Sequence, residues 1–175
     1  MQKKNQANIL AKECIVTALM QLLEEKPFSA ITISELTERA GVSRMTYYRN
    51  YQAKEDIFEI YLDDVLEHYR EDVQELMLKG NYYDKDNMVH YFSYLRDHRI
   101  FLECLVKNGF GHLLLRTISK YVMATWYREG DGVERYYMLQ AFAGALFTLY
   151  LTWSNNGMQE TPEQMAEILR KIYNA

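Results

Sequence analysis

Residues 31–51 read ITISELTERAGVSRMTYYRNY, a pattern of two short helices joined by a turn. Thr32 and Glu35 have the spacing of a capping box, in which the two side chains bind free backbone N–H groups at the start of a helix. Gly41 can adopt the left-handed conformation that ends this helix, and Ser43 is a favourable N-cap for the next one. A helix, a short turn containing glycine and a second helix form a helix-turn-helix motif, which places its second helix in the major groove of DNA.

A longer pattern surrounds the motif. It consists of a first helix of about twenty residues followed by Phe28, Thr32, Ile33, Leu36, the run AGVS at 40–43, Thr46, Tyr48, Tyr51 and the pair Lys54 and Glu55. With these residues the chain resembles the DNA-binding domain of the TetR family of bacterial transcriptional regulators over roughly residues 7–60. Met45 stands where the family commonly has glycine, and Asn50 where it commonly has histidine. These departures leave the expected fold intact but bear on which DNA sequence is recognised.

Nine side chains are expected to contact DNA, because they lie on the recognition helix (residues 44–51), cap it, or begin a flanking helix. The N-terminal end of that helix meets base edges, and the residues there are Arg44, Met45 and Thr46, with Ser43 as their N-cap. Contacts to phosphate or to the groove wall are expected from Tyr48, Arg49 and Asn50. Phosphate clamps at the starts of the second and fourth helices are expected from Thr32 and Lys54.

The charge distribution agrees with a DNA-binding head. The 175 residues carry a formal net charge of −4. Residues 1–54 contain eight basic and five acidic side chains, whereas residues 55–175 contain twelve basic and nineteen acidic ones. Such an imbalance also arises by chance, so it adds weight only beside the motif. A basic head on an acidic body would turn toward phosphate. We therefore expect a DNA-binding domain at 1–54 and a ligand-binding and dimerisation domain at 55–175.

Helical patterns cover nearly the whole chain, and we expect an all-α fold of about nine helices. Apolar residues recur at helical spacing from Ala7 to Leu23, and Pro27 ends that helix. A long fourth helix is expected to begin at Lys54 and to break at Gly80. Further helices are expected near residues 87–97, 99–108, 113–127, 133–154 and, with Thr161 as N-cap, from 162 onward.

The helix expected at 133–154 is apolar on almost every side. A helix of this kind must be buried all round, and a short chain can hardly surround it alone. A membrane span is disfavoured because Arg135 and Gln140 bracket its start and the apolar run is short. We expect a homodimer instead, and the family resemblance implies that the last two helices pair with those of a second subunit. The expected interface residues are Ala141, Gly144, Ala145, Ile168, Leu169 and Ile172.

Residues 82–153 hold sixteen of the twenty-four Phe, Trp and Tyr residues. These aromatic side chains could simply fill a core. A buried tyrosine needs a polar partner, however, so an interior rich in tyrosine suits a cavity that holds water or a ligand. The expected lining residues are His90, Tyr94, His112, Tyr121, Trp126, Phe147 and Tyr150. The resemblance implies that this cavity is the inducer site, for an unidentified apolar or amphipathic small molecule, with no other cofactor.

Enzyme, metal and membrane classes find no support in the sequence. It has no nucleophile elbow, no glycine-rich phosphate loop and no metal-binding histidine pair. No apolar run is long enough to span a bilayer, and the polar N-terminus is unlike a signal peptide. Cys14 and Cys104 are far apart and are expected to be reduced. We therefore expect a cytoplasmic protein without catalytic or metal-binding residues.

These features predict a ligand-responsive transcriptional regulator, a repressor that binds a palindromic operator as a dimer. One alternative belongs to another class: a protein of the same shape that has lost inducer control and acts as an adaptor through a partner protein. The head of such an adaptor should lack phosphate-clamping residues. Thr32, Tyr48 and Lys54 are all present, which favours DNA.

Overall fold

The fold is all-α, as predicted. The computed structural model describes residues 2–75 and 81–173, and within them it contains nine α-helices, one 3-10 turn and no strand. The helices are α1 (Gln2–Glu25), α2 (Ile33–Arg39), α3 (Arg44–Asn50), α4 (Asp56–Glu75), α5 (Lys85–Asp97), α6 (Arg99–Lys107), α7 (Gly111–Trp126), α8 (Val133–Asn155) and α9 (Pro162–Tyr173). The 3-10 turn, η1 (Phe28–Ala30), follows α1.

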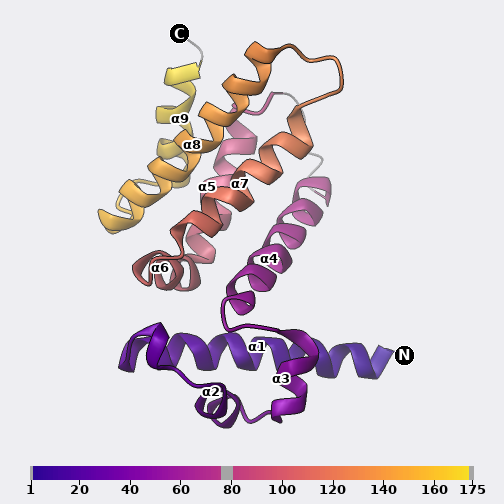
Figure 1. Cartoon of the computed structure of the whole chain (residues 1–175). Coiled ribbons are helices and arrows are strands. Elements are labelled where there is room, and N and C mark those ends of the chain that lie inside the picture. Colours follow the sequence, from indigo (N-terminus) through magenta and orange to yellow (C-terminus); the bar gives the residue numbers. More distant parts are fainter. Residues whose placement is uncertain (1, 76–80, 174–175) are drawn as a thin grey trace.

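The first three helices form a small head. α1 lies across the end of the molecule, with α2 and α3 on the side of α1 that faces away from the other helices (Figure 1). Ile15 and Leu19 of α1 are fully buried together with Leu36 of α2 and Tyr47 of α3. Helices of only seven residues, such as α2 and α3, are not stable alone in water. The apolar side of α1 therefore holds both of them in place.

The core-facing side of α1 begins later than the sequence predicted. Ala7 is exposed and Leu10 has an exposed fraction of 60%, whereas Ile15 and Leu19 are fully buried. The N-terminal part of α1 extends beyond the rest of the head (Figure 1), and Leu10 on it stays largely exposed.

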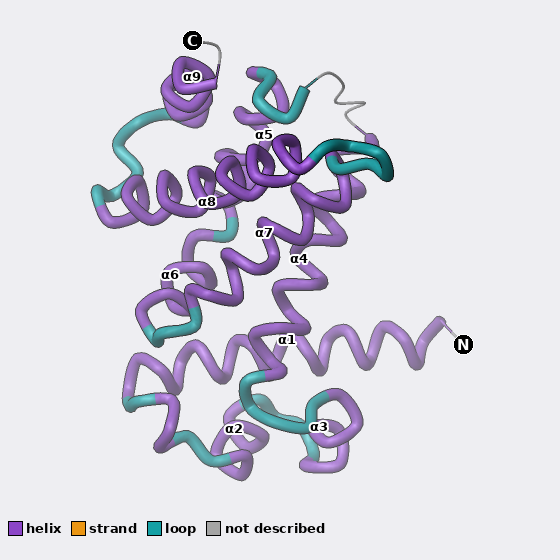
Figure 2. Tube along the Cα trace, turned by 45° about the horizontal axis from the view of Figure 1, so that its top comes forward, coloured by secondary structure: helices purple, strands orange, loops and turns teal. Residues whose placement is uncertain are grey.

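The body consists of α4 to α9. α4 leads from the head into the body, α7 packs against α8, and α5 packs against α9 (Figures 1 and 2). Large aromatic side chains fill much of the interior. Trp153 of α8, for example, meets Phe92 of α5 edge to face at a centroid distance of 5.7 Å, and its indole N–H donates to the backbone oxygen of Glu160 at 3.1 Å.

Two of the predicted helix starts form with their predicted caps. The capping box of Thr32 and Glu35 is present at the start of α2. At the start of α9, Thr161 Oγ1 accepts a hydrogen bond from the backbone N–H of Gln164 at 3.3 Å, while Gln164 Oε1 accepts one from the N–H of Thr161 at 2.8 Å. Local sequence patterns therefore set where these helices begin.

The start of α4 differs from the prediction. The helix begins at Asp56 and not at Lys54. The Asp56 carboxylate accepts hydrogen bonds from the backbone N–H groups of Gln52 at 2.8 Å and Ala53 at 3.0 Å, and these bonds hold the preceding residues in a turn. The predicted break at Gly80 lies outside the described residues.

Candidate nucleic-acid interface and ligand cavity

The helix α3 is anchored to the head by one aromatic side chain. Tyr47 is fully buried, and its ring contacts those of Tyr48 and Tyr51 at centroid distances of 5.3 and 5.5 Å. Burial raises the pKa of the Tyr47 hydroxyl to about 12, so this side chain is uncharged. At the start of the helix, Ser43 Oγ accepts a hydrogen bond from the N–H of Thr46 at 3.1 Å. The burial of Tyr47 in the core therefore sets which side of α3 faces the head and which side faces solvent.

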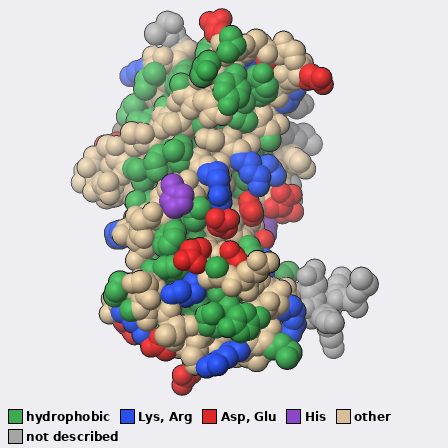
Figure 3. Space-filling model, in the orientation of Figure 1, with side chains coloured by type: hydrophobic (Ala, Val, Ile, Leu, Met, Phe, Trp, Pro, Cys, Tyr) green, Lys and Arg blue, Asp and Glu red, His purple; other side chains and the backbone are tan. Residues whose placement is uncertain are grey.

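The solvent-facing side of α3 carries two basic and two largely apolar side chains. Arg44, Met45, Tyr48 and Arg49 are exposed, with exposed fractions of 76% for Met45 and 60% for Tyr48. Arg44 Nη2 donates to Ser34 Oγ of α2 at 2.7 Å, and the other N–H groups of this guanidinium can bind elsewhere. Basic and hydrophobic side chains lie side by side on the lower part of the head, where α2 and α3 lie in Figure 1 (Figure 3). These four side chains can therefore reach DNA.

Two other predicted contact residues are partly withdrawn into their own helix. Thr46 is half-buried, and its hydroxyl lies 2.9 Å from Ser43 Oγ. Asn50 is also half-buried, and its Nδ2 donates to the backbone oxygen of Thr46 at 2.9 Å. The hydrogen-bonding groups of Ser43, Thr46 and Asn50 are thus engaged within α3 and its cap.

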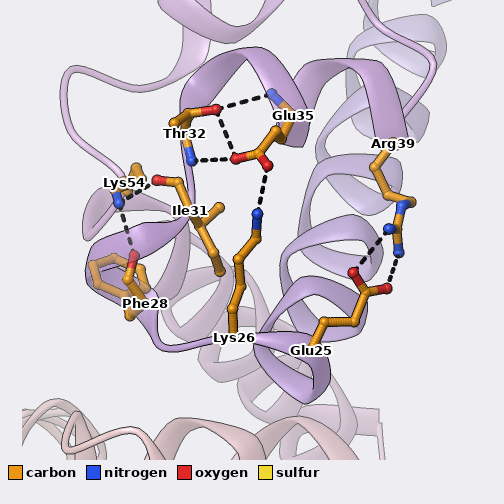
Figure 4. A network of polar contacts seen from close by, with 8 residues as sticks. All are labelled: Glu25, Lys26, Phe28, Ile31, Thr32, Glu35, Arg39 and Lys54. Carbon is orange, nitrogen blue, oxygen red and sulfur yellow. Dashed lines mark hydrogen bonds and ion pairs between the residues drawn. The ribbon is translucent and has the colours of Figure 1, made fainter.

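The structure gives Lys54 a role inside the head that the sequence did not predict. Its ammonium group donates to the backbone oxygens of Phe28 at 2.8 Å and Ile31 at 2.5 Å, and it lies 4.6 Å from the centre of the Phe28 ring (Figure 4). An ammonium group has three N–H donors. Because two of them bind carbonyl groups around η1, Lys54 supports the internal structure of the head, and its predicted contact with phosphate stays a prediction.

Thr32 also takes part in the internal structure of the head. Its hydroxyl accepts from the N–H of Glu35 at 3.2 Å and donates to Glu35 Oε2 at 2.8 Å. Glu35 Oε1 accepts from Lys26 at 2.5 Å, and the hydrogen bonds from Lys26 and Thr32 lower the pKa of Glu35 to about 2. Beside this network, Arg39 of α2 binds Glu25 of α1 through two hydrogen bonds of 2.8 and 3.2 Å (Figure 4). The network ties α2 to the end of α1.

An aromatic cluster joins the head to the body. Phe28 of η1 contacts Phe58 of α4 and Phe110, the N-cap of α7, at centroid distances of 5.7 and 4.9 Å. Phe58 and Phe110 are 4.7 Å apart, and Phe101 of α6 lies 6.2 Å from Phe58. In the sequence, Phe28 is recognisable only as a match to the family pattern. Its partners lie thirty or more positions away, so no local signal could reveal the contact.

A narrow cavity lies in the body, with a volume of about 70 Å³. Its walls come mainly from α4, α5, α7 and α8, and they consist of uncharged side chains. The wall residues are Leu62, Val65, Leu66, Tyr69, Tyr82, Asn87, Met88, Tyr91, Tyr94, Leu95, Leu102, Leu114, Thr117, Ile118, Tyr121, Val122, Trp126, Phe142 and Leu146. Three of the predicted lining residues, Tyr94, Tyr121 and Trp126, are among them.

Tyrosine hydroxyls supply most of the polar atoms near this cavity. The Tyr94 hydroxyl donates to the backbone oxygen of Val65 at 2.8 Å, and burial raises its pKa to about 12. The ring of Tyr69 lies between those of Tyr94 and Tyr121, 5.1 Å from each. Tyr91 is buried, and its hydroxyl has no hydrogen-bond partner among the described residues. None of the α4 residues of the wall was among the predicted lining residues, although their helical spacing in the sequence could have identified them.

Four predicted lining residues lie elsewhere. The imidazole ring of His90 stacks on the ring of Tyr69 at a centroid distance of 4.9 Å, and burial lowers the pKa of His90. His112 is exposed near the start of α7, and Phe147 packs beside Gly111. Tyr150 is buried outside the cavity wall. The assignment of these four residues to the wall is corrected because helical rotation turns their side chains away from the cavity.

One side of α8 and α9 is uncovered in the single chain. The exposed residues of α8 recur at helical spacing and include Val133, Tyr137, Ala141, Thr148 and Thr152. Gly144 and Ala145 are half-buried, and Ile168 and Ile172 of α9 have exposed fractions of 43% and 58%. We call this surface, with Gly144 and Ala145 at its centre, the α8–α9 face. Leu169 is fully buried within its own chain, so its predicted place at an interface is corrected.

Two further classes of feature are absent from the described part of the chain. No group of three or more His, Cys, Asp and Glu side chains there is placed to hold a metal ion. No helix within residues 2–75 and 81–173 is long and apolar enough to cross a membrane. Cys14 and Cys104 are free and half-buried.

Two family models match the sequence. One is described as a transcriptional regulator C-terminal region and matches residues 85–175, which is more than half of the chain. The other is described as bacterial regulatory proteins, tetR family, and matches residues 15–60, which include α2, α3 and the start of α4.

Individual proteins with a similar sequence or fold are also known. The chain is 25% identical over 167 residues to the uncharacterized HTH-type transcriptional regulator YxbF of Bacillus subtilis (strain 168), a match that covers 90% of this chain and 43% of YxbF. The chain spans about half the length of the curated relatives it matches.

Two solved structures illustrate the fold. Lin0861 from Listeria innocua has a TM-score of 0.79 at 15% identity, covering 97% of this chain and 92% of Lin0861. The dihydroxyacetone kinase operon activator DhaS has a TM-score of 0.61 at 16% identity, covering 94% of each chain. At these identities the likeness concerns the fold alone.

Proposed function

Because this chain belongs to the TetR family of bacterial transcriptional regulators, we propose that it is a ligand-responsive repressor that binds a palindromic operator in the cytoplasm as a homodimer. The observation that carries the proposal is the surface of α3. A buried Tyr47 holds the helix in one rotation, and Arg44, Met45, Tyr48 and Arg49 face solvent from it. A rigid helix with basic and apolar side chains on one side suits the major groove.

The α8–α9 face supports a dimer. Exposed apolar side chains on a soluble chain are common singly, but a continuous apolar surface commonly marks an interaction site. Ala141, Gly144 and Ala145 are small, and a Cβ atom added at Gly144 would meet no other atom within 4 Å in the single chain. A second copy of α8 can therefore approach closely. Two-fold symmetry would place two copies of α3 about 34–36 Å apart, the spacing of successive major grooves.

The uncharged cavity supports an effector that is itself small and uncharged. Its volume of about 70 Å³ is below the roughly 150 Å³ of an apolar cavity that admits benzene. An effector with more than a few non-hydrogen atoms therefore requires the wall helices to separate. The buried hydroxyl of Tyr91, which lacks a partner among the described residues, offers such a molecule one hydrogen bond.

The position of α4 supports repression with release by the effector. α4 supplies Leu62, Val65, Leu66 and Tyr69 to the cavity wall, and its other end contacts the head through Phe58. Widening the cavity would move α4 and change the separation of the two heads. By linkage, DNA would then weaken effector binding by the same factor. The fold alone does not set the sign of control, because DhaS is described as an activator.

One observation favours the alternative function, an adaptor that acts through a partner protein. Its main counter-argument was the presence of three phosphate-clamping residues, and two of them, Thr32 and Lys54, are engaged within the head. A single experiment separates the two functions. The full-length protein is used to select duplexes from a random DNA library, and binding of the enriched site is measured at several salt concentrations. A palindromic site whose affinity falls steeply with salt supports the repressor. Absence of any enriched site overturns it and favours the adaptor.

The effector is tested separately by thermal shift. A panel of small aromatic and aliphatic alcohols, ketones and phenols is compared with carboxylates of the same size, since an uncharged wall would exclude a charged group. Fluorescence of Trp126, which lies on the cavity wall, should change for the same compounds that raise the melting temperature. Stabilisation by carboxylates alone would contradict the proposed effector class.

A further inference from the structure

The most exposed large hydrophobic side chain among the described residues lies on α3. Met45 has an exposed fraction of 76%, the highest value among such side chains. It is the second residue of a helix whose neighbouring positions carry Arg44 and Arg49. Within the described residues, Met45 is therefore not part of the hydrophobic core.

The direction of Met45 follows from the burial of Tyr47. Two positions along an α-helix correspond to roughly 200° of rotation. Because Tyr47 points fully into the head, Met45 points almost directly away from it, on the same side as Tyr48, three positions later. Hydrophobic side chains therefore lie beside basic ones on the lower surface of the head (Figure 3).

The chemistry of a methionine limits what it can read in DNA. Its thioether donates no hydrogen bond and is at most a weak acceptor. The base edges in the major groove are hydrogen-bonding groups, with one exception: the methyl group on C5 of thymine. An unbranched, flexible and polarisable side chain packs well on such a group.

We propose that Met45 is a specificity-determining residue that packs on the C5-methyl group of a thymine in each half-site, so that the operator carries an A·T pair at that position. This inference rests on the proposed DNA-binding function and adds to it one base preference with its physical cause. Arg44, held by Ser34, would contact an adjacent base pair or phosphate through its remaining N–H groups.

The test changes a single methyl group. In the selected operator, each thymine of one half-site is replaced in turn by deoxyuridine, which lacks the C5-methyl and keeps the Watson–Crick pairing. Burying one such carbon is worth about 0.8 kcal/mol, or roughly a fourfold change in affinity. We expect one position in each half-site at which deoxyuridine lowers the affinity of the wild-type protein about fourfold. When this position is changed in both half-sites, the two fourfold losses of affinity should roughly multiply.

Variants assign that loss to Met45. Met45→Ala should bind the thymine and the deoxyuridine operators equally, whereas Ile100→Ala, which removes a comparably exposed side chain of the body, should keep the fourfold difference. The A·T pair is also replaced by a G·C pair, with either cytosine or 5-methylcytosine. We expect the operator with 5-methylcytosine to bind more tightly than the one with cytosine, because it keeps the methyl group.

The outcomes separate the inference from the function beneath it. If the wild-type protein tolerates deoxyuridine at every position, or if Met45→Ala keeps the difference, the inference is wrong while DNA binding stands. If the library yields no site, the proposed function is wrong and the inference falls with it; an exposed Met45 then belongs to a protein-binding surface.

Discussion

The head and the body of this chain are held together by different kinds of contact. In the head, caps join residues three positions apart, as between Thr32 and Glu35 or Ser43 and Thr46, and a few ion pairs link α1 to α2. In the body, rings from distant helices pack on one another and leave a narrow cavity between them. Under the proposed function, the head would be a preformed surface for reading DNA, and the body would contain the space that a ligand widens.

The two regions meet at surfaces of different character. An apolar junction is formed by Phe28, Phe58 and Phe110, and a polar one includes the ion pair of Lys12 with Asp64. Farther into the body, Arg116 binds Glu59 at 3.1 Å and Lys120 binds Asp63 at 3.2 Å, so exposed ion pairs link α7 to α4. A band of acidic and basic side chains crosses the middle of the molecule (Figure 3). Exposed pairs of this kind contribute little, so the aromatic junction dominates the coupling.

The largest effect is expected from Tyr47→Ala in the head. Removing a fully buried aromatic side chain should lower the free energy of unfolding by about 3–5 kcal/mol. Urea unfolding is followed by far-UV circular dichroism, which reports both regions, and by tryptophan fluorescence, which reports only the body. The aromatic junction predicts that both midpoints fall together.

Tyr48→Ala is the matched control, because Tyr48 is the exposed neighbour and its removal should change stability by less than about 0.5 kcal/mol. A fluorescence midpoint that stays at the wild-type value in Tyr47→Ala would mean that head and body unfold independently.

The next effect concerns the outer surface of the body. In the single chain a Cβ atom added at Gly144 meets no other atom within 4 Å, so we expect Gly144→Leu to fold. At a symmetric interface the added side chain should cost about 1–3 kcal/mol at each of two contacts and shift the protein toward monomers. Light scattering over a range of concentrations measures this shift. Gly132→Leu, at another open glycine that precedes α8, should leave the assembly unchanged. Equal behaviour of the two variants would remove the α8–α9 face as the dimer interface.

Substitutions at Lys54 and at Arg49 should change different properties of the protein: its stability and the salt dependence of its DNA binding, respectively. Lys54→Met removes two hydrogen bonds from a charged donor and should lower the free energy of unfolding by about 1.5–3 kcal/mol. It should leave the slope of log affinity against log salt unchanged. Arg49→Ala should leave stability unchanged and reduce that slope by about 0.9 for the phosphate contact in each half-site, or about 1.8 for the dimer. A reduced slope in Lys54→Met would support the phosphate clamp that the sequence suggested.

The smallest effect is the acid sensitivity of the head. Glu35 has a pKa of about 2 in the folded protein against 4.5 in an unfolded chain, because Lys26 and Thr32 bind its charged form. Its contribution to stability is therefore complete above pH 4.5 and is lost as the pH falls toward 2. Glu35→Gln should remove this part of the pH dependence, while the part due to Glu25, whose pKa Arg39 also lowers, remains. The two proteins are compared by urea midpoints at decreasing pH. If stability falls with decreasing pH in the same way in both proteins, Glu35 does not contribute to the acid sensitivity of the head.

Sequence patterns sufficed where the deciding contacts are local. The capping box of α2 and the N-caps of α3 and α9 depend on neighbours within one helical turn. The same is true of the family, since TetR-like residues recur at fixed spacing in one segment. For Lys54 the spacing gave no sign of its contacts within the head, because its partners Phe28 and Ile31 lie 26 and 23 positions away.

The sequence by itself determined the all-α fold, the helix-turn-helix head and the family, because periodicity, capping and turn residues act over short distances along the chain. Only the tertiary structure decided which side chains face the cavity, the solvent or a neighbouring helix. Tyr94 and Tyr121 line the cavity while His90 and Tyr150 do not, and Leu169 is buried while Ile168 is exposed. The physical reason is helical rotation: adjacent residues of a helix differ by about 100° in direction, so small differences in how two helices pack reassign a whole row of side chains.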